Sequence, residues 1–245
     1  MSSYKAPLDD IRFALFDVLD SEETFARLGF ADANRELVDA VIDEAARFAE
    51  TVLAPLNKVG DEVGCTFDPA DGSVTTPPGF AEAYRNIRSA LLLNPSGKPF
   101  RTLTVISAVP KEGKTTTSAN LATSFAQTGH KVLIVDADLH RGGIHRFFGL
   151  QAGRGLTEIL TGRSTLDQVV QHTAVAGLDL IGTGAFPDNP AELVLRREMK
   201  EFLAHASELY DLVVLDAPPI LAVSESTVIA SQTDGVLLVV WGGRT

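Results

Sequence analysis

The spacing of apolar residues differs between two parts of the chain, and the change falls near residue 80. Residues 8–19 and 34–53 carry apolar side chains at helical spacing with acidic residues between them, which is the pattern of amphipathic helices. Residues 67–80 contain three prolines and two glycines, which indicates turns and a linker. We therefore predict a small all-α segment over residues 1–80.

From residue 81 onward, continuous apolar runs alternate with helical patterns. Predicted strands cover 102–107, 131–136, 177–182, 211–216 and 235–241, and predicted helices cover 81–93, 115–127, 155–171 (broken near Gly162), 190–208 and 223–231. Uninterrupted apolar strands are typical of parallel sheets that are covered by helices on both faces. The regular alternation predicts an α/β domain over residues 81–245 with a doubly wound, mostly parallel sheet.

Charge is spread unevenly over the 245 residues. The net charge is −11, from 21 basic and 32 acidic residues. Residues 1–80 hold 6 of the basic and 16 of the acidic residues, which suggests two segments of different character. The chain has no basic block or tail, so nothing favours non-specific binding to nucleic acid, and we expect no such partner.

Cysteine content and hydropathy favour a cytoplasmic protein. Cys65 is the only cysteine, so no intramolecular disulfide can form, as is usual in reducing compartments. We see no secretory signal at the N-terminus, and no apolar run reaches the roughly 18 residues needed to span a bilayer. A partner would be needed to hold such a protein at the inner face of a membrane.

A phosphate-binding loop lies between a predicted strand and a predicted helix. The segment Ala108–Thr115 fits the pattern Ala-x4-Gly-Lys-Thr, and backbone N–H groups of such a loop converge on one point. An anionic polyphosphate is therefore the expected ligand. Lys114 can reach its outer phosphates, and Thr115 can bind the accompanying Mg²⁺. The residues expected to contact the nucleotide are Ala108, Val109, Pro110, Lys111, Glu112, Gly113, Lys114, Thr115 and Thr116.

Three aspartates follow two of the predicted strands. Asp136 and Asp138 come at the end of one apolar run, and Asp216 ends another. Ligands of parallel sheets lie beyond the carboxyl ends of the strands, so we expect these carboxylates to share one edge with the phosphate loop. Each of them could instead cap the helix that follows. Together, loop and aspartates predict a P-loop NTPase fold that binds ATP and Mg²⁺.

Five motifs over residues 81–245 resemble those of the bacterial tyrosine kinases, the P-loop kinases that regulate capsule and exopolysaccharide assembly. They are the loop 107–116, the acidic segments 135–141 and 214–219, the helix motif of Glu82, Arg85 and Arg88, and the segment 187–193. The resemblance implies transfer of the γ-phosphoryl group of ATP to protein tyrosine. It also implies activation by a membrane polysaccharide co-polymerase, and homo-oligomerisation through Glu82, Arg85 and Arg88.

The same resemblance implies roles for the charged residues. Lys114 neutralises the developing charge, while Thr115 and Asp216 hold Mg²⁺ and Asp138 joins them. Asp136 is the candidate base for the incoming phenol. The spacing alone does not decide between Asp136 and Asp138 as the base, and it also allows Asp136 a purely orienting role.

The sequence departs from this family in two places. His140 stands where the family usually has arginine. The family continues beyond the strand at 235–241 and ends in a tyrosine-rich tail, whereas this chain has only Tyr4, Tyr84 and Tyr210. We therefore expect a domain that is truncated at its C-terminus and cannot phosphorylate a tail of its own.

Residues 1–80 resemble a different family, at the extreme N-terminus of the acyl-CoA dehydrogenases. The resemblance rests on residues 4–13, 48–57, 60–62 and 67–69. The flavin site and catalytic carboxylate of that family lie in later parts that this chain lacks. The sequence therefore reads as a fusion joined near Phe80.

Three other functions are open at this point. A partitioning or division-site ATPase of the deviant Walker class would carry a signature lysine where Val109 stands. A truncated domain could bind nucleotide and oligomerise without catalysis. A fragment of a flavin-dependent acyl-CoA dehydrogenase would be expected to hold flavin.

Overall fold

The computed structural model describes residues 5, 8–18, 34–48, 66–67, 74–75, 80–92 and 100–241. Contacts divide the chain into one unit of residues 1–64 with 242–244 and a second unit of residues 65–241 with 245. The predicted boundary near residue 80 adjoins residues 76–79, which lie outside the described residues, so it stays a prediction. Within the predicted linker, β1 (Thr66–Phe67) and β2 (Val74–Thr75) pair as antiparallel strands.

The first unit contains helical segments held together by an arginine. They are α1 (Leu8–Arg12), the π-helical turn η1 (Phe13–Val18) that continues it, and α3 (Arg35–Phe48). Arg12 donates from Nε to Asp39 Oδ1 at 2.9 Å and from Nη2 to Asp43 Oδ1 at 2.5 Å. Helices therefore occur in both predicted places, and residues 49–53 of the second prediction lie outside the described residues.

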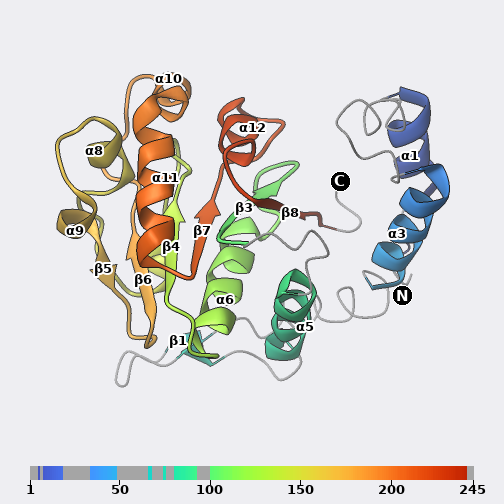
Figure 1. The fold of residues 1–245 in the computed structure, drawn as a ribbon, viewed down its shortest axis with the longest axis horizontal. Coiled ribbons are helices and arrows are strands. Elements are labelled where there is room, and N and C mark those ends of the chain that lie inside the picture. Colours follow the sequence, from blue (N-terminus) through green and yellow to red (C-terminus); the bar gives the residue numbers. More distant parts are fainter. Residues whose placement is uncertain are drawn as a thin grey trace. The chain divides into compact units, whose positions relative to one another are not determined.

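The second unit is built on a six-stranded sheet with the order β5-β6-β4-β7-β3-β8 (Figure 1). Its strands are β3 (Thr102–Ser107), β4 (Val132–Asp136), β5 (Gln171–His172), β6 (Leu178–Ile181), β7 (Leu212–Asp216) and β8 (Gly235–Val239). All neighbours pair in parallel except β5, which pairs antiparallel with β6. The predicted mostly parallel sheet is thus confirmed.

Helices cover both faces of this sheet. They are α5 (Phe80–Leu92), α6 (Lys114–Ala126), α7 (Ile144–Phe147), α8 (Leu156–Leu160), α9 (Leu166–Val169), α10 (Pro190–Leu195), α11 (Arg197–Leu209) and α12 (Glu225–Ala230). Residues of α5 and α6 share one buried core with Val214 of β7, whereas residues of α8 to α12 share the other with Val213 and Leu215. Neighbouring residues of one strand therefore enter opposite cores, which is why the strands read as unbroken apolar runs.

Two predicted helices are each divided in two. The predicted helix 155–171 is α8 and α9, followed by the short strand β5, and Gly162 after α8 has a left-handed φ of 68°. The predicted helix 190–208 separates into α10 and α11 at Arg196, which is extended (φ −65°, ψ 156°). The break near Gly162 was predicted, and residues 161–165 separate α8 from α9. The break at Arg196 was not predicted, because apolar spacing continues across this single non-helical residue.

Arg88 fixes α5 to α6. Its Nη1 donates to Ser124 O at 2.6 Å and to Ser124 Oγ at 2.9 Å. Arg85 and Glu82 pair with each other on an exposed face of α5. Of the three residues predicted to join subunits, Arg88 is therefore engaged within the chain, whereas Glu82 and Arg85 are exposed.

Candidate active site

The phosphate loop joins β3 to α6 and contains two residues in the left-handed region. Gly113 has φ 87° and Lys111 has φ 71°. No side chain caps α6 at Gly113, and the helix opens with a hydrogen bond from Thr117 N to Gly113 O. The N–H groups of its first turn therefore lack partners within the helix and carry the positive end of the helix dipole. This is the arrangement in which helix N-termini bind phosphate.

The start of the loop is tied to the segment that follows β7. Ile220 N donates to Ser107 O at 2.8 Å, and Leu221 N donates to Ala108 O at 3.2 Å. At its other end, Thr116 lies in the first turn of α6 and its carbonyl accepts from Asn120 Nδ2 at 2.8 Å. The start of the loop is thereby held by the turn after β7, and its end is continuous with α6.

Lys114 is buried between two of the predicted aspartates. Its Nζ lies 3.4 Å from Asp216 Oδ1 and 3.9 Å from Asp138 Oδ2. The structure therefore brings together three residues that the sequence predicted for one site. A buried lysine among carboxylates compensates charge that would otherwise be unfavourable.

Asp216 accepts hydrogen bonds from two hydroxyl groups of α6. Thr115 Oγ1 donates to its Oδ2 at 2.7 Å, and Ser118 Oγ donates to its Oδ1 at 3.1 Å. Burial raises the pKa of Asp216, and the charge of Lys114 with these hydrogen bonds opposes the rise. Ser118 was not predicted, although it lies one helical turn after Lys114, where an α-helix brings side chains onto the same face.

Asp136 is completely buried beside Asp216, with which it is in register across β4 and β7. Its Oδ1 accepts from Asp138 N at 3.3 Å, and its Oδ2 accepts from Ile144 N at 3.1 Å. Burial, followed by the charge of Asp216, raises the pKa of Asp136 to about 6, against the opposing effect of backbone N–H groups. Both oxygens of this carboxylate are thus turned toward the backbone of the loop after β4.

Asp138 presents one oxygen to the loop backbone and the other to Lys114. Its Oδ1 accepts from His140 N at 3.2 Å and from Arg141 N at 2.9 Å. His140 also contacts the buried Glu225 of α12, with 3.0 Å between Nε2 and Oε1. Glu225 was not predicted, because nothing in its local sequence indicates a partner 85 residues away.

Gly142 allows the loop after β4 to fold against Asp136. A Cβ at this position would lie 1.7 Å from Thr183 Oγ1 and 2.7 Å from Asp136 Oδ2. Any other residue would therefore displace the Thr183 hydroxyl, the carboxylate or the loop itself. Among the described residues, Thr183 Oγ1 is one of four buried side-chain polar atoms without a hydrogen-bond partner.

The donor atoms suit Mg²⁺ that arrives with a nucleotide. The described residues contain no group of three or more His, Cys, Asp or Glu side chains that could hold a metal by themselves. Mg²⁺ on phosphates needs only one or two carboxylates, because phosphate oxygens and water complete its octahedron. Asp216, Asp138 and the Thr115 hydroxyl supply such oxygens at the loop.

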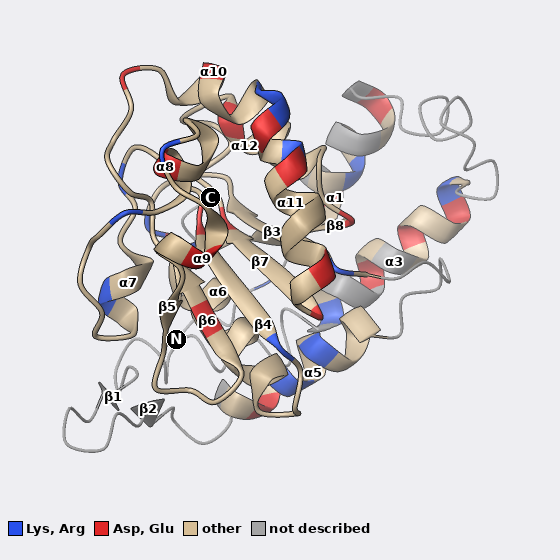
Figure 2. Ribbon diagram, turned by 60° about the vertical axis from the view of Figure 1, so that its left-hand side comes forward, with Lys and Arg blue, Asp and Glu red and all other residues tan. Residues whose placement is uncertain are grey.

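Figure 2 shows the strands almost entirely uncharged, and in the five parallel strands only Asp136, Asp179 and Asp216 carry charge.

Comparisons with known proteins agree with this geometry. The family model described as AAA domain matches residues 105–241. The chain is 41% identical to tyrosine-protein kinase YwqD of Bacillus subtilis over 165 residues, which are 67% of this chain and 70% of that protein. The chain belongs to the bacterial tyrosine-protein kinases.

Other members of the family are longer or have been solved as domains. Tyrosine-protein kinase etk of Escherichia coli is 40% identical over 172 residues, 70% of this chain but 23% of that kinase. The solved kinase domain of Escherichia coli ETK is 39% identical with a TM-score of 0.65, and the match covers 67% of this chain and 65% of the domain. The chain thus spans less than a quarter of etk and about two thirds of the solved domain.

The comparisons do not support the acyl-CoA dehydrogenase resemblance of residues 1–80. The family model begins at residue 105, and both relatives and the solved domain are tyrosine kinases. Within the described part of the chain, no helix is both long and apolar enough to cross a membrane.

We predict that Asp136 makes the nucleotide-free kinase domain lose stability as pH rises. The folded pKa is about 6 against an ordinary 3.8, so protonation stabilises the fold fully below pH 3.8, and this contribution disappears as pH rises through 6. Between pH 5 and 7.5, the free energy of unfolding should fall by about 1 kcal/mol more in the parent than in Asp136→Asn. Urea unfolding of both proteins without nucleotide and Mg²⁺ measures this, and parallel pH profiles would contradict it.

Proposed function

We propose that this chain binds ATP with Mg²⁺ and transfers the γ-phosphoryl group to a tyrosine of a protein. The observation that carries the proposal is the placement of Lys114 between Asp138 and Asp216 at the start of α6. Phosphoryl transfer depends on positioning and charge neutralisation more than on covalent chemistry. This cluster supplies a cation, hydroxyl and carboxylate oxygens, and uncapped backbone N–H groups within one small region.

The transfer needs an acceptor that loses a proton. The phenolic oxygen attacks the γ-phosphorus, the bond to the bridging oxygen of ADP breaks, and the phenolic proton passes to a carboxylate. Asp138, whose side chain is 13% exposed and reaches Lys114, is better placed for this than the wholly buried Asp136. We therefore assign Asp136 the orienting of the loop and Asp138 the contacts with nucleotide, Mg²⁺ and acceptor. Mg²⁺, when bound, neutralises charge on the transferring phosphates.

The proposed acceptor is neither of the two described tyrosines. Tyr84 and Tyr210 are buried, at 8% and 5% exposure, and Tyr4 lies outside the described residues. The Tyr210 hydroxyl moreover donates to Asp179 Oδ2 at 2.9 Å. Neither described tyrosine can enter an active site without local unfolding.

The proposed setting is the control of exopolysaccharide or capsule synthesis in the cytoplasm. It rests on the kinase motifs of residues 81–245 and on membership of the family. A membrane polysaccharide co-polymerase is the proposed activator. Phosphotransfer should therefore be assayed with labelled ATP both alone and with the cytoplasmic segment of a candidate activator.

Lys114→Ala should lower phosphotransfer to tyrosine by roughly 100-fold, because a preorganised charge near the transferring group contributes about that much. The loss of MgADP affinity should be smaller, since the backbone N–H groups of the loop remain. Lys200→Ala on the exposed face of α11 is the control. Undiminished transfer by Lys114→Ala would refute the kinase proposal, and hydrolysis of ATP by the parent without phosphotyrosine would favour an ATPase.

Asp216→Asn and Asp138→Asn should each raise the Mg²⁺ concentration needed for half-maximal ATP binding by about tenfold. Both changes keep the side-chain size and remove the charge that attracts the metal. Binding of nucleotide in EDTA should change less. Asp167→Asn on α9 is the control, and equal Mg²⁺ titrations for all four proteins would mean that the aspartates are structural.

Self-association is proposed to use the exposed Glu82 and Arg85. Arg85→Ala should weaken association while changing the free energy of unfolding by less than about 0.5 kcal/mol. Arg88→Ala should lower the free energy of unfolding by about 1.5–3 kcal/mol, because the charged hydrogen bonds from Arg88 to Ser124 are lost. Light scattering gives the masses and urea unfolding the stabilities. We also expect a chain beginning at Gly79 to form larger assemblies than the full chain. Equal masses for the parent, the two arginine variants and the shortened chain would exclude this interface.

A further inference from the structure

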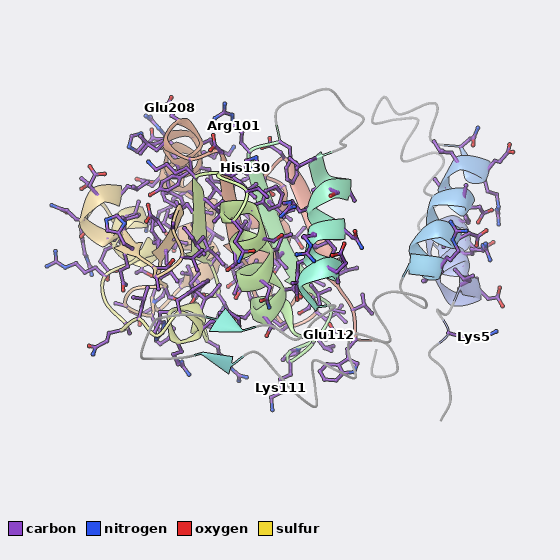
Figure 3. The ribbon with its side chains drawn as sticks, turned by 90° about the horizontal axis from the view of Figure 1, so that it is seen from below. Lys5, Arg101, Lys111, Glu112, His130 and Glu208 are labelled. Carbon is purple, nitrogen blue, oxygen red and sulfur yellow. The ribbon has the colours of Figure 1, made fainter. Side chains whose placement is uncertain are left out.

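Glu112 is a buried acid inside a loop that is built to bind phosphate. It occupies a variable position of the loop motif, between Lys111 and Gly113, and it is only 6% exposed. In Figure 3 the side chain of Lys111 points away from the protein, whereas that of Glu112 lies against it. A carboxylate so close to a phosphate site would repel the ligand unless its charge were directed elsewhere.

Both oxygens of Glu112 accept backbone N–H groups from different segments. Val109 N donates to Oε2 at 2.9 Å, and Trp241 N donates to Oε1 at 3.0 Å. Val109 belongs to the start of the loop, and Trp241 follows β8. The side chain therefore closes the loop on itself and joins it to the end of the sheet's edge strand.

The backbone beside Glu112 is in an unfavourable conformation. Lys111, with φ 71°, is the only described non-glycine residue in the left-handed region. Such a residue persists only where surrounding contacts hold it, and these positions concentrate at binding sites. The two hydrogen bonds of Glu112 act on the residue that directly follows Lys111, so they are suited to hold this turn.

We propose that Glu112 is a positioning residue: by bridging Val109 N and Trp241 N it holds Lys111 in the left-handed region and keeps the phosphate loop in its binding shape. This inference rests on the proposed binding of nucleotide. Charge-assisted hydrogen bonds to two backbone N–H groups are strong enough to define the loop before the ligand arrives.

The bridge itself is tested without nucleotide. Hydrogen exchange is followed at the amides of Val109 and Trp241 in the parent and in Glu112→Ala, Glu112→Gln and Glu198→Gln. Glutamine keeps one accepting oxygen and replaces the other by a donor, so it can serve only one of the two amides. Both amides should exchange faster in Glu112→Ala, one of them in Glu112→Gln, and neither in the control on the exposed face of α11. Unchanged exchange at both amides in both Glu112 variants would overturn the proposal.

The consequence for binding is tested by calorimetry with MgADP. Glu112→Ala should weaken binding by about tenfold, the effect typical of residues that position the direct ligands of a site, and Glu112→Gln should fall between it and the parent. Glycine adopts positive φ without strain, so Lys111→Gly combined with Glu112→Ala should recover at least part of the affinity. If Glu112→Ala is unstable, the MgADP affinity of Glu112→Gln is compared with that of the parent instead.

The outcomes separate this inference from the proposed function. A parent that binds no MgADP would refute nucleotide binding, while the amide exchange would still report on the bridge. A parent that binds and Glu112 variants that bind equally well would overturn the positioning role. Affinity that is lost in Glu112→Ala and not recovered at all by Lys111→Gly would assign Glu112 to another contact and would also overturn it.

Discussion

The contact between Lys114 and Asp216 is the constraint on which the rest of the site depends. Asp216 is 2% exposed, and an ionised carboxylate so deeply buried is unfavourable unless it is compensated. The compensation comes from Lys114, Thr115 and Ser118, all of which lie in the first turns of α6. Helix α6 must therefore begin directly against the end of β7. The shape of the phosphate loop follows, because the loop has to connect β3 to a helix whose start is already fixed.

The parallel pairing of β4 with β7 creates the second half of the site. It places Asp136 in register with Asp216, so that two carboxylates lie close together in the protein interior. Backbone N–H groups of Asp138 and Ile144 hold Asp136, which requires the chain after β4 to fold back closely over it. Gly142 leaves the space for that fold. The same fold brings Asp138 close to Lys114. The pairing of β4 with β7 in the interior therefore determines that Asp138, and not Asp136, contacts the lysine of the phosphate loop.

The sequence predicts those parts of the molecule that depend on local patterns. The apolar runs at β3, β4 and β7 and the loop before α6 were predicted within about one residue, because a strand buried on both faces and a phosphate loop each have a local signature. The break near Gly162 was predicted, whereas the break at Arg196 was missed, since apolar spacing continues across it. The contact of Glu225 with His140, the position of Thr183 beside Gly142 and the bridge from Glu112 to Trp241 could not be predicted, because only the folded chain brings these distant segments together.

Under the proposed function, the charge balance at the site couples the binding of the nucleotide to the binding of the metal. One lysine faces two carboxylates in this structure, and the buried Asp136 adds acid behind them. Phosphates that bind to the loop add negative charge and compete with Asp138 and Asp216 for Lys114. The carboxylates then need another cation, and their oxygens with the Thr115 hydroxyl suit Mg²⁺. Nucleotide binding thus strengthens metal binding, and by linkage the metal strengthens nucleotide binding by the same factor. The arrangement that makes the free site electrostatically unfavourable is therefore what makes it selective for a nucleotide together with its metal.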